Sequence, residues 1–414
     1  MLGFSRTRIS PLGIDLGASS VKLLQIAHGD PPQMLCAAAG VLPEEARTDP
    51  ATRQTFIAET IKKLIKAGSF HGNRIICSLP AYQTLVHHLQ LACGKGEELT
   101  DQINEQLRLR LNVEPSRMVV RHVAVAQTMC DGSPRQEVIC IAASREAVMR
   151  HIRMFSQLKL NVVGMHSESA AVLHAFGHLY RRADDVNRTT CFIDIGAATT
   201  KVVIAHGREM VFSKTIHAAG DHFTRELAHS QNISFAEARR RREQVQQTVP
   251  AAAVAAVQGS AVPTLPMTRG PLAIIAAQME AQHPAQHSGP SVCHDRAIPG
   301  MTAAKPSSAV TADPDAPYDT LESLIDELQL SIRHHQSLFP QRQIEKLVFL
   351  GSEAKHTLTC QKIAKAVRIG AQLGDPLARL TRIGANVQPI GVDLRQPQPG
   401  WAVPLGLCLC EPNL

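Results

Sequence analysis

Two hydrophobic patterns alternate along most of the chain. Short apolar runs rich in Val, Ile and Leu predict buried β-strands, and segments with apolar residues three or four positions apart predict amphipathic helices. A chain in which strands and helices alternate is typical of the α/β class. We expect strands within 12–28 (two, joined by a turn), 74–80, 138–144 and 346–352, and helices at 53–67, 145–158, 319–337 and 356–367. Residues 160–176 predict a strand, a turn and a helix.

Residues 78–128 and 249–317 differ from this background. The first segment predicts a strand, a helix and a further strand. Its helix has a narrow apolar stripe, suited to packing inside its own subdomain, formed by Leu99, Ile103, Leu107 and Leu111. The second segment contains ten of the 25 prolines and no aromatic residue. Such a composition buries too little apolar surface to offset the entropy lost on ordering, so we expect a disordered insertion with one candidate helix at 271–282.

One short pattern occurs twice. "GIDLGASSVK" (13–22) and "FIDIGAATTK" (192–201) each contain a strand that ends in Asp, a Gly two positions later and a Lys seven positions after the Asp. The residues that follow are β-formers, and the chain lacks the glycine motifs that place phosphates at a helix N-terminus. Each copy therefore predicts a hairpin of two antiparallel strands.

These hairpins carry candidate chemistry. Backbone N–H groups of residues 17–20 can point at phosphate oxygens, and Asp15 can hold hydrated Mg²⁺, which uses few protein ligands. Two facing hairpins, produced by an ancient duplication, would grip a nucleotide's phosphates from both sides. The alternative is that Asp and Gly only satisfy the geometry of two tight turns.

Composition narrows the function classes. Aromatic residues make up only 4% of the chain, which disfavours a base-stacking nucleic-acid platform. We find neither an apolar stretch of about 20 residues that would span a membrane nor a secretory signal. The scattered cysteines lack zinc-site spacing and predict buried free thiols in a reducing cytosol. The net charge of +7 is mild, and the basic run 239–242 is either a solvated helix face or an anion contact.

On these motifs the chain resembles the actin-like ATPase superfamily, and within it the PilM family of type IV pilus assembly proteins. The resemblance covers most of the chain outside 249–317. The family's first hairpin is mirrored by Asp15, Gly17, Ser19, Ser20, Val21 and Lys22, and its later motifs by residues 216–234 and Trp401–Leu409.

The resemblance implies an actin-like fold with two duplicated α/β domains. The first would contain residues 1–77 and 129–188, with an FtsA-like subdomain inserted at 78–128. The second would contain residues 189–248 and 318–414, interrupted by the insertion 249–317 and ending in a C-terminal helix.

The resemblance also implies a site for ATP and Mg²⁺. Asp15 and Asp194 would bind the metal, and Glu168 and Asp194 would be catalytic, with Glu168 orienting water. The alternative for Glu168 is a structural place in the first turn of a helix capped by Ser167. The implied nucleotide-binding residues are Asp15, Gly17, Ser19, Ser20, Lys22, Asp194, Gly196, Ala198, Thr199, Gly220, Arg242, Glu327, Ser331, Gly351 and Ser352.

Several residues depart from the family pattern on the side of the adenosine. At the position of the family's Gly-rich loop this chain has Gly351-Ser352-Glu353-Ala354. Glu353 would hinder the close backbone approach that Gly permits. A basic helix position has become Leu330, and the first Gly of a Gly-Gly pair is Ala219. We therefore expect ATP binding with weak or absent hydrolysis.

Other polar residues have competing interpretations. Lys22 and Lys201 either neutralise phosphates or lie solvated at strand edges. We expect the histidine pairs at 87–88 and 334–335 to be exposed rather than metal ligands.

The implied function is a cytoplasmic nucleotide-binding scaffold of the pilus platform, peripheral to the inner membrane through partners. It would bind the N-terminal cytoplasmic tail of a PilN-like bitopic membrane protein in a groove between the 85–127 subdomain and the first domain, and would contact the pilus assembly ATPase. The alternatives are a sugar or small-molecule kinase, for which we find no convincing Asp base, and a filament-forming protein like FtsA, whose amphipathic C-terminal helix is not evident here.

Overall fold

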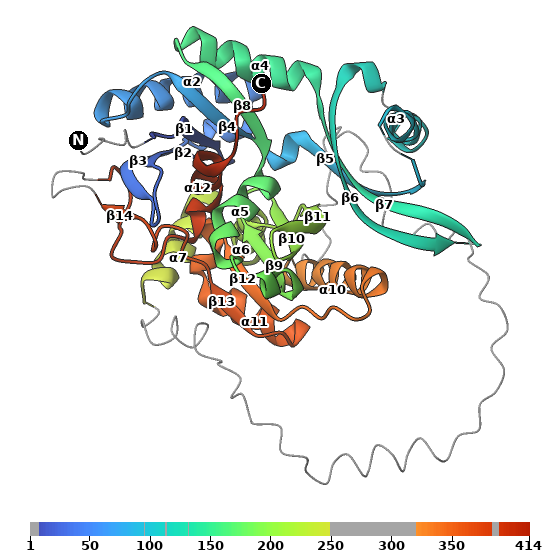
Figure 1. The fold of residues 1–414 in the computed structure, drawn as a ribbon. Coiled ribbons are helices and arrows are strands. Elements are labelled where there is room, and N and C mark those ends of the chain that lie inside the picture. The colour runs from blue at the N-terminus through green and yellow to red at the C-terminus, as the bar shows by residue number, and fades with distance from the viewer. Residues whose placement is uncertain (1–7, 95, 112–113, 131, 249–319, 383–388) are drawn as a thin grey trace, which may run out of the picture.

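The computed structural model describes residues 8–94, 96–111, 114–130, 132–248, 320–382 and 389–414. The described residues form two large β-sheets, with helices on their outer faces and between them (Figure 1). The expected insertion 249–317 and its candidate helix 271–282 lie outside the described residues.

The first sheet has the strand order β14-β3-β2-β1-β4-β8. Two helices, α2 (Pro50–Ala67) and α4 (Arg145–Gln157), cover its outer face, and the short α1 (Glu45–Thr48) precedes α2. Ile61 of α2 and Phe155 of α4 pack on Ile14 in a fully buried core. The strands are β1 (Leu12–Leu16), β2 (Ser20–Ala27), β3 (Gln33–Val41), β4 (Arg74–Leu79), β8 (Asn161–Ser167) and β14 (Thr381–Arg382).

The second sheet has the order β11-β10-β9-β12-β13. Its outer face is covered by α10 (Thr320–Leu338) and α11 (Thr357–Val367), whose Leu328 and Ile363 pack in one core with Ile193. The strands are β9 (Thr189–Ile195), β10 (Thr200–His206), β11 (Glu209–Ile216), β12 (Lys346–Leu350) and β13 (Ala371–Leu373).

The two sheets repeat one topology. In each, a central strand, β1 or β9, pairs antiparallel with the strand that follows it and parallel with a later strand, β4 or β12. The register places Asp15 opposite Lys22 and Asp194 opposite Lys201. Residues directly opposite in an antiparallel pair point to the same face. The spacing of seven between Asp and Lys is therefore the spacing of cross-strand neighbours, and both predicted hairpins are confirmed.

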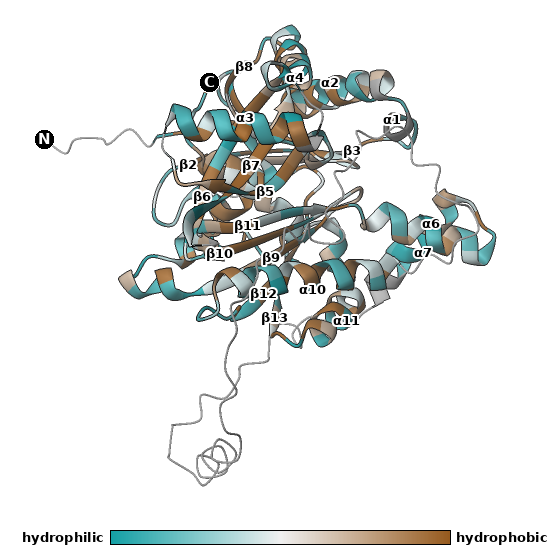
Figure 2. Ribbon diagram, turned by 90° about the vertical axis from the view of Figure 1, so that its right-hand side faces the viewer, coloured by the Kyte–Doolittle hydropathy of each residue, from teal (hydrophilic) through white to brown (hydrophobic). Residues whose placement is uncertain are grey.

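Two helices lie between the sheets. They are α5 (Glu168–Phe176) and α12 (Ala402–Leu409), and they contact each other (Figure 1). A Cβ on Gly406 of α12 would lie 1.8 Å from the carbonyl oxygen of Ala171 in α5, so only glycine permits this crossing. The surrounding core joins the inner faces of both sheets through Leu24, Phe192 and Trp401. The apolar strands and inward helix faces are visible as brown ribbon in Figure 2.

A third sheet, β5-β7-β6, forms the inserted subdomain. It consists of β5 (Thr84–Ala92), β6 (Met118–Cys130) and β7 (Ser133–Ser144), with α3 (Glu97–Leu111) on one face. Leu99, Ile103 and Leu107 of α3 are buried against this sheet, as their spacing predicted.

Two expected domain boundaries need correction. Strand β7, expected in the first domain, pairs with both β5 and β6, so the subdomain extends to Ser144 rather than to 128. Strand β14, expected in the second domain, pairs with β3 of the first sheet. Both strands are assigned by long-range pairing, which local pattern does not specify.

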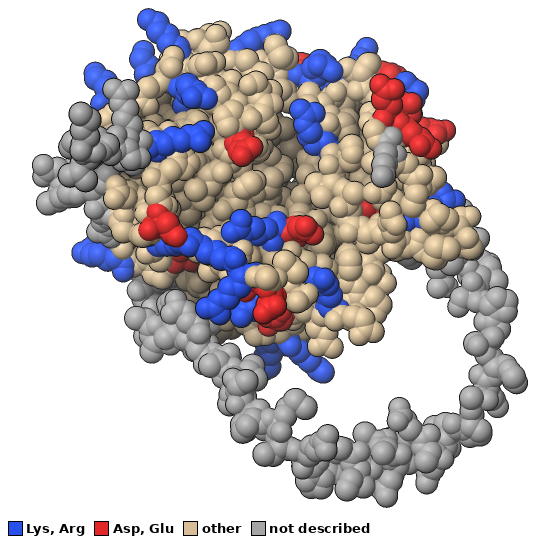
Figure 3. Space-filling model, in the orientation of Figure 1, with Lys and Arg blue, Asp and Glu red and all other residues tan. Residues whose placement is uncertain are grey.

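Some surface expectations are confirmed and one is wrong. The free and buried cysteines are Cys36, Cys77, Cys140, Cys191, Cys360, Cys408 and Cys410, and Cys93 is free and exposed. Basic and acidic side chains are interspersed over the face in Figure 3, with an acidic group over α3. The expectation that the histidine pairs are exposed is wrong, because His335 is fully buried and the His88 side chain is only 7% exposed. His88 stacks on Phe212 of the second sheet, and His335 contacts His206 and Phe339.

Candidate functional site

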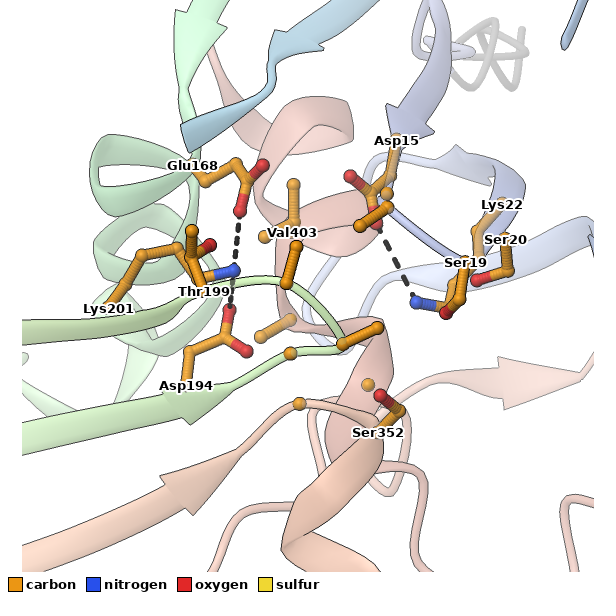
Figure 4. A pocket seen from close by; sticks show the side chains of 18 of the residues that line it. Asp15, Ser19, Ser20, Lys22, Glu168, Asp194, Thr199, Lys201, Ser352 and Val403 are labelled. Carbon is orange, nitrogen blue, oxygen red and sulfur yellow. Dashed lines mark hydrogen bonds and ion pairs between the residues drawn. The ribbon is translucent and has the colours of Figure 1, made fainter. Parts of the chain in front are cut away.

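The two hairpins face each other across a small cavity between the sheets, here called the central cleft (Figure 4). Their turns contribute opposite walls, and the end of α5 and the segment before α12 complete it. The cleft brings together many residues that the sequence singled out: Asp15, Gly17, Ser19, Ser20, Lys22, Glu168, Asp194, Gly196, Ala198, Thr199, Gly351 and Ser352.

The first turn is fixed from behind by helix α2. Arg53 donates hydrogen bonds to the carbonyl oxygens of Gly17 (2.8 Å) and Ala18 (2.9 Å). A Cβ on Gly17 would lie 2.9 Å from the carbonyl oxygen of Ser20, so the tight turn requires a small residue there. Because Arg53 occupies these two carbonyl groups, they are not available to a ligand in the cleft.

Asp15 is buried and oriented by the neighbouring strand. The Ser78 hydroxyl donates to Asp15 Oδ1 (3.0 Å) and accepts a hydrogen bond from the backbone N–H of Leu16 (3.1 Å). Lys22 Nζ lies 3.7 Å from Asp15 Oδ2, and its side chain is 17% exposed. The first hairpin thus presents an ionisable carboxylate and a partly accessible ammonium group to the cleft.

In the second hairpin the lysine is buried among carboxylates. Lys201 Nζ lies 2.5 Å from Glu168 Oε2 and 3.2 Å from Asp194 Oδ2, and each of these three side chains is 8% exposed (Figure 4). Burial alone would lower the pKa of Lys201, but Asp194 and Glu168 outweigh burial and raise it. Lys201 is therefore charged, and the interpretation of this residue as a solvated strand edge is wrong.

Glu168 lies at the first turn of α5. Ser167 caps this helix by accepting a hydrogen bond from the N–H of Ala170, and Glu168 Oε1 accepts one from the N–H of Ala81 (3.0 Å). Burial raises the pKa of Glu168, and the charges of Asp15 and Asp194 add to this, while Lys201 opposes it. The capping interpretation is thus confirmed, and the same turn also aims Glu168 into the cleft.

The loop after β12 approaches the second hairpin very closely. Gly351 has a φ of 89°, and a Cβ there would lie 2.1 Å from the carbonyl oxygen of Ile195 and 2.5 Å from Asp194 Oδ1. The glycine is required by both conformation and space. This contact packs the β12 loop directly behind Asp194.

The residues implied for the adenosine side do not all reach the cleft lining. Arg242, in α7 (Phe235–Thr248), donates to the carbonyl oxygen of Gly220 (2.8 Å) and to Glu353 Oε2 (2.5 Å). The Glu353 carboxylate would lie 2.5 Å from a Cβ on Gly220, so the bulky Glu353 is accommodated because residue 220, at the start of α6 (Gly220–Gln231), is glycine. Burial raises the pKa of Glu353, against the effect of Arg242.

Two other implied residues lie on the far side of the second sheet. Glu327 and Ser331 are in α10, which packs on the face opposite to α5. Glu327 forms an ion pair with Lys214, and the Ser331 hydroxyl donates to the Glu327 carbonyl oxygen. Neither lines the central cleft.

Several lining residues were not among the predicted site residues. Tyr82 accepts a hydrogen bond from Arg53 Nε at 3.0 Å, and Lys201 has already been described. The others come from the two turns and from the segment around Trp401: Ala18, Ala197, Pro399, Gly400, Ala402 and Val403. The family motif at Trp401–Leu409 includes Ala402 and Val403, but it did not indicate that they line the cleft, because only the packing of α12 between the sheets brings them here.

The free volume of the central cleft is about 50 Å³. Pockets that enclose a ligand of nucleotide size are usually about 300–1,000 Å³. The donor set nevertheless fits a metal-bound polyphosphate, because Asp15 is an oriented oxygen ligand and the small residues of both turns line the cleft beside it. A nucleotide therefore requires the hairpins to move apart.

A second, larger cavity of about 960 Å³ adjoins the cleft, and we call it the side cavity. It lies between α2, the three-stranded sheet and helices α6 and α7. Tyr82, Ala18 and Ala198 line both cavities. The side cavity has apolar residues such as Leu85, Met118 and Phe235, and a rim with Arg53, Arg150, Arg225, Glu44 and Asp221.

Comparisons with known proteins agree with this architecture. The model of the type IV pilus assembly protein PilM family matches residues 13–254, and that of cell division protein FtsA matches residues 191–373. No curated protein matches the chain.

Among solved structures, a chain of a PilM–PilN type IV pilus biogenesis complex is similar with a TM-score of 0.66 and 18% identity, over 97% of this chain and 98% of that one. The ethanolamine utilization protein EutJ from Carboxydothermus hydrogenoformans follows with a TM-score of 0.44 and 12% identity, over 97% and 89% of the two chains. Because one family model covers more than half of its residues, the chain belongs to the type IV pilus assembly protein PilM family, with an actin-like ATPase fold.

Proposed function

We propose that this protein is a nucleotide-binding scaffold of the type IV pilus assembly platform on the cytoplasmic side of the inner membrane. Its ligand would be the N-terminal cytoplasmic tail of a PilN-like bitopic membrane protein. Membrane attachment would come through this partner, since no helix among the described residues is long and apolar enough to cross a bilayer. The likeness to a chain of a PilM–PilN complex over nearly its whole length supports this assignment.

The observation that carries the proposal is the side cavity. Its volume of about 960 Å³ and its position between the subdomain and the first domain are those expected for a peptide groove. Leu85 and Met118 offer apolar contacts, and charged groups at the rim, such as Arg150, can fix the orientation of a bound segment. A short peptide recognised by apolar anchors and polar rim contacts fits this lining.

ATP with Mg²⁺ belongs to the same proposal. Asp15 would ligate the metal, the two turns would hold phosphates through backbone N–H groups, and Lys22 would add a positive charge. Bound Mg²⁺ would supply charge neutralisation for the phosphates. Lys201 already forms ion pairs with Asp194 and Glu168. Glu168 is the carboxylate best placed to orient water, and this ion pair holds it in place. We therefore expect binding without rapid hydrolysis, in a scaffold that also contacts the pilus assembly ATPase.

The test is binding of a fluorescently labelled peptide that corresponds to the cytoplasmic tail of the PilN-like protein from the same genome. We expect saturable 1:1 binding to the full chain. Leu85→Glu should weaken it at least 10-fold, because it places a charge in the apolar part of the side cavity.

Leu109→Glu is the matched control, since Leu109 is 71% exposed on α3 and does not line the side cavity. It should leave the affinity unchanged. Circular dichroism would confirm that both variants are folded. A tail peptide that fails to bind the wild-type protein, or binds the folded Leu85 variant equally well, would refute the proposed peptide site.

A further inference from the structure

Three metal-ligand side chains meet where the three-stranded sheet packs on the second sheet. His88 comes from β5, Glu137 from β7 and His334 from α10. His88 Nδ1 lies 3.4 Å from Glu137 Oε1, and His334 Nε2 lies 3.7 Å from the same oxygen. All three candidate ligand atoms are within 4.8 Å of one another.

The two imidazole nitrogens are buried, and their contacts with Glu137 are long. Neither His88 Nδ1 nor His334 Nε2 has a hydrogen bond among the described residues, and both have almost no exposed surface. Buried polar atoms without a hydrogen bond are uncommon in folded proteins, because burial removes their hydrogen bonds to water. Both are directed toward the same carboxylate, and a shared ligand would satisfy both.

Neighbouring groups already fix the orientation of the His88 ring. Its other nitrogen, Nε2, lies 3.3 Å from the carbonyl oxygen of Ser213, and the ring stacks on Phe212 with centroids 4.7 Å apart. The backbone N–H of Ser213 also lies 3.4 Å from Nε2, so Nε2 can either donate to the Ser213 carbonyl or accept from this N–H. The proposed site uses the tautomer in which Nε2 donates, because Nδ1 then has a free lone pair. A carbonyl that orients a histidine in this way is typical of the outer shell of metal sites.

The geometry points to a site for a divalent transition metal ion, and we propose that His88 Nδ1, Glu137 and His334 Nε2 bind Zn²⁺. Zinc ligands at about 2.0–2.1 Å in a tetrahedron are about 3.3 Å apart, close to the spacing of Oε1 from each nitrogen. Two imidazoles and one carboxylate favour zinc over Mg²⁺ or Ca²⁺, which prefer oxygen ligands. Three protein ligands leave the fourth position to water.

The charge and access of the site suit a cation. The Glu137 carboxylate would supply negative charge to a bound cation, and the two imidazoles are neutral when they act as ligands. His334 is 20% exposed and provides an entrance, whereas His88 and Glu137 are 7% and 6% exposed.

A bound ion would fasten the subdomain to the second domain. β5 and β7 belong to the three-stranded sheet, and α10 packs on the outer face of the second sheet. Thr84 and Leu85 of β5 also line the side cavity, so the ion would stiffen one of its walls. The metal site is independent of whether the side cavity binds a peptide.

The test uses the full chain without a histidine tag, stripped of metal with a chelator and dialysed against Zn²⁺ or Co²⁺. We expect one tightly bound zinc per chain by elemental mass spectrometry, visible Co²⁺ absorption typical of a four-coordinate site, and a higher melting temperature with Zn²⁺ than with chelator.

His334→Gln and Glu137→Gln should each weaken zinc binding at least 10-fold and abolish the zinc-dependent rise in melting temperature. His122→Gln is the control, since His122 is exposed on β6 of the same sheet, and it should bind zinc as the wild type does. If a variant misfolds, the wild-type Co²⁺ spectrum still decides the matter. Sub-stoichiometric zinc in the wild type, or equal binding by the folded His334 variant, would overturn the proposal.

Discussion

At the scale of single residues, the two hairpins place equivalent lysines in different environments. Lys22 and Lys201 each lie opposite an aspartate in the same register. Lys22 stays partly exposed at 3.7 Å from Asp15, whereas Lys201 is buried between Asp194 and Glu168. The equivalent lysines of the two hairpins therefore differ in role: Lys22 is an accessible cation, and Lys201 is an internal counter-ion.

Lys201→Met should strongly destabilise the protein near neutral pH. It leaves two buried carboxylates without their counter-ion, a change that typically costs about 3–5 kcal/mol. Urea unfolding followed by the fluorescence of Trp401, the single tryptophan, measures the free energy of unfolding.

The pH dependence of that loss has a definite sign. Without Lys201 the pKa of Glu168, already raised by burial, lies further above its unfolded value. A carboxyl group whose pKa is raised in the folded state stabilises the fold when it is protonated, so the deficit should shrink as the pH falls. Lys22→Met is the matched control and should cost less than about 1 kcal/mol. A deficit that is equal for both lysines, or independent of pH, would contradict this account.

At the scale of elements, α5 and α12 hold the two sheets together. Their crossing at Gly406 and Ala171 allows one core to reach the inner faces of both sheets. The central cleft opens at one end of this helix pair, with Glu168 from α5 and Val403 from α12 in its lining. The separation of the helices therefore influences the width of the cleft.

Gly406→Ala should destabilise the protein although alanine favours helices. The new Cβ would lie 1.8 Å from the Ala171 carbonyl oxygen, and overpacking of this kind costs about 1–3 kcal/mol against a propensity gain of about 1 kcal/mol. We expect a lower melting temperature by differential scanning calorimetry.

Gly177→Ala is the comparison for the α5–α12 crossing. Gly177 has a helical backbone, and a Cβ there would meet nothing closer than 4.0 Å. It should be neutral or slightly stabilising. An unchanged melting temperature for Gly406→Ala would mean that the helices separate without cost.

At the scale of the whole molecule, the structure shows a closed central cleft beside an open side cavity. The cleft has about 50 Å³ of free volume and the side cavity about 960 Å³. Tyr82, Ala18 and Ala198 form a common wall between them. Opening of the cleft for a nucleotide would move this wall, so the two ligands should influence each other's affinity by equal factors.

Millimolar ATP with Mg²⁺ should change the fluorescence of Trp401. This residue is buried next to Gly400, which lines the cleft, and separation of the hairpins would alter its surroundings. Asp15→Asn should weaken the effect about 10-fold by removing a charge-assisted contact. Asp101→Asn, an exposed change on α3, should have no effect. If calorimetry detects no heat of binding at millimolar ATP and Mg²⁺, the proposal of nucleotide binding is rejected.

The sequence alone determined the local elements and the repeated hairpins. The alternation of apolar runs and amphipathic segments depends on contacts between near neighbours, and Asp and Gly at fixed spacing mark a turn whatever surrounds it. The repeated pattern therefore predicted Asp15, Asp194 and the glycines that follow them as site residues, and all of them line the cleft. The departure at Glu353 was also visible in the sequence.

Only the tertiary structure decided which distant segments meet. The burial of Lys201 depends on α5, the place of Glu353 depends on Gly220, and the cluster of His88, Glu137 and His334 joins three separate elements. Glu327 and Ser331 lie on the outer face of a sheet for the same reason. Charge, burial and ligand geometry are set by neighbours in space, and one sequence records only neighbours along the chain.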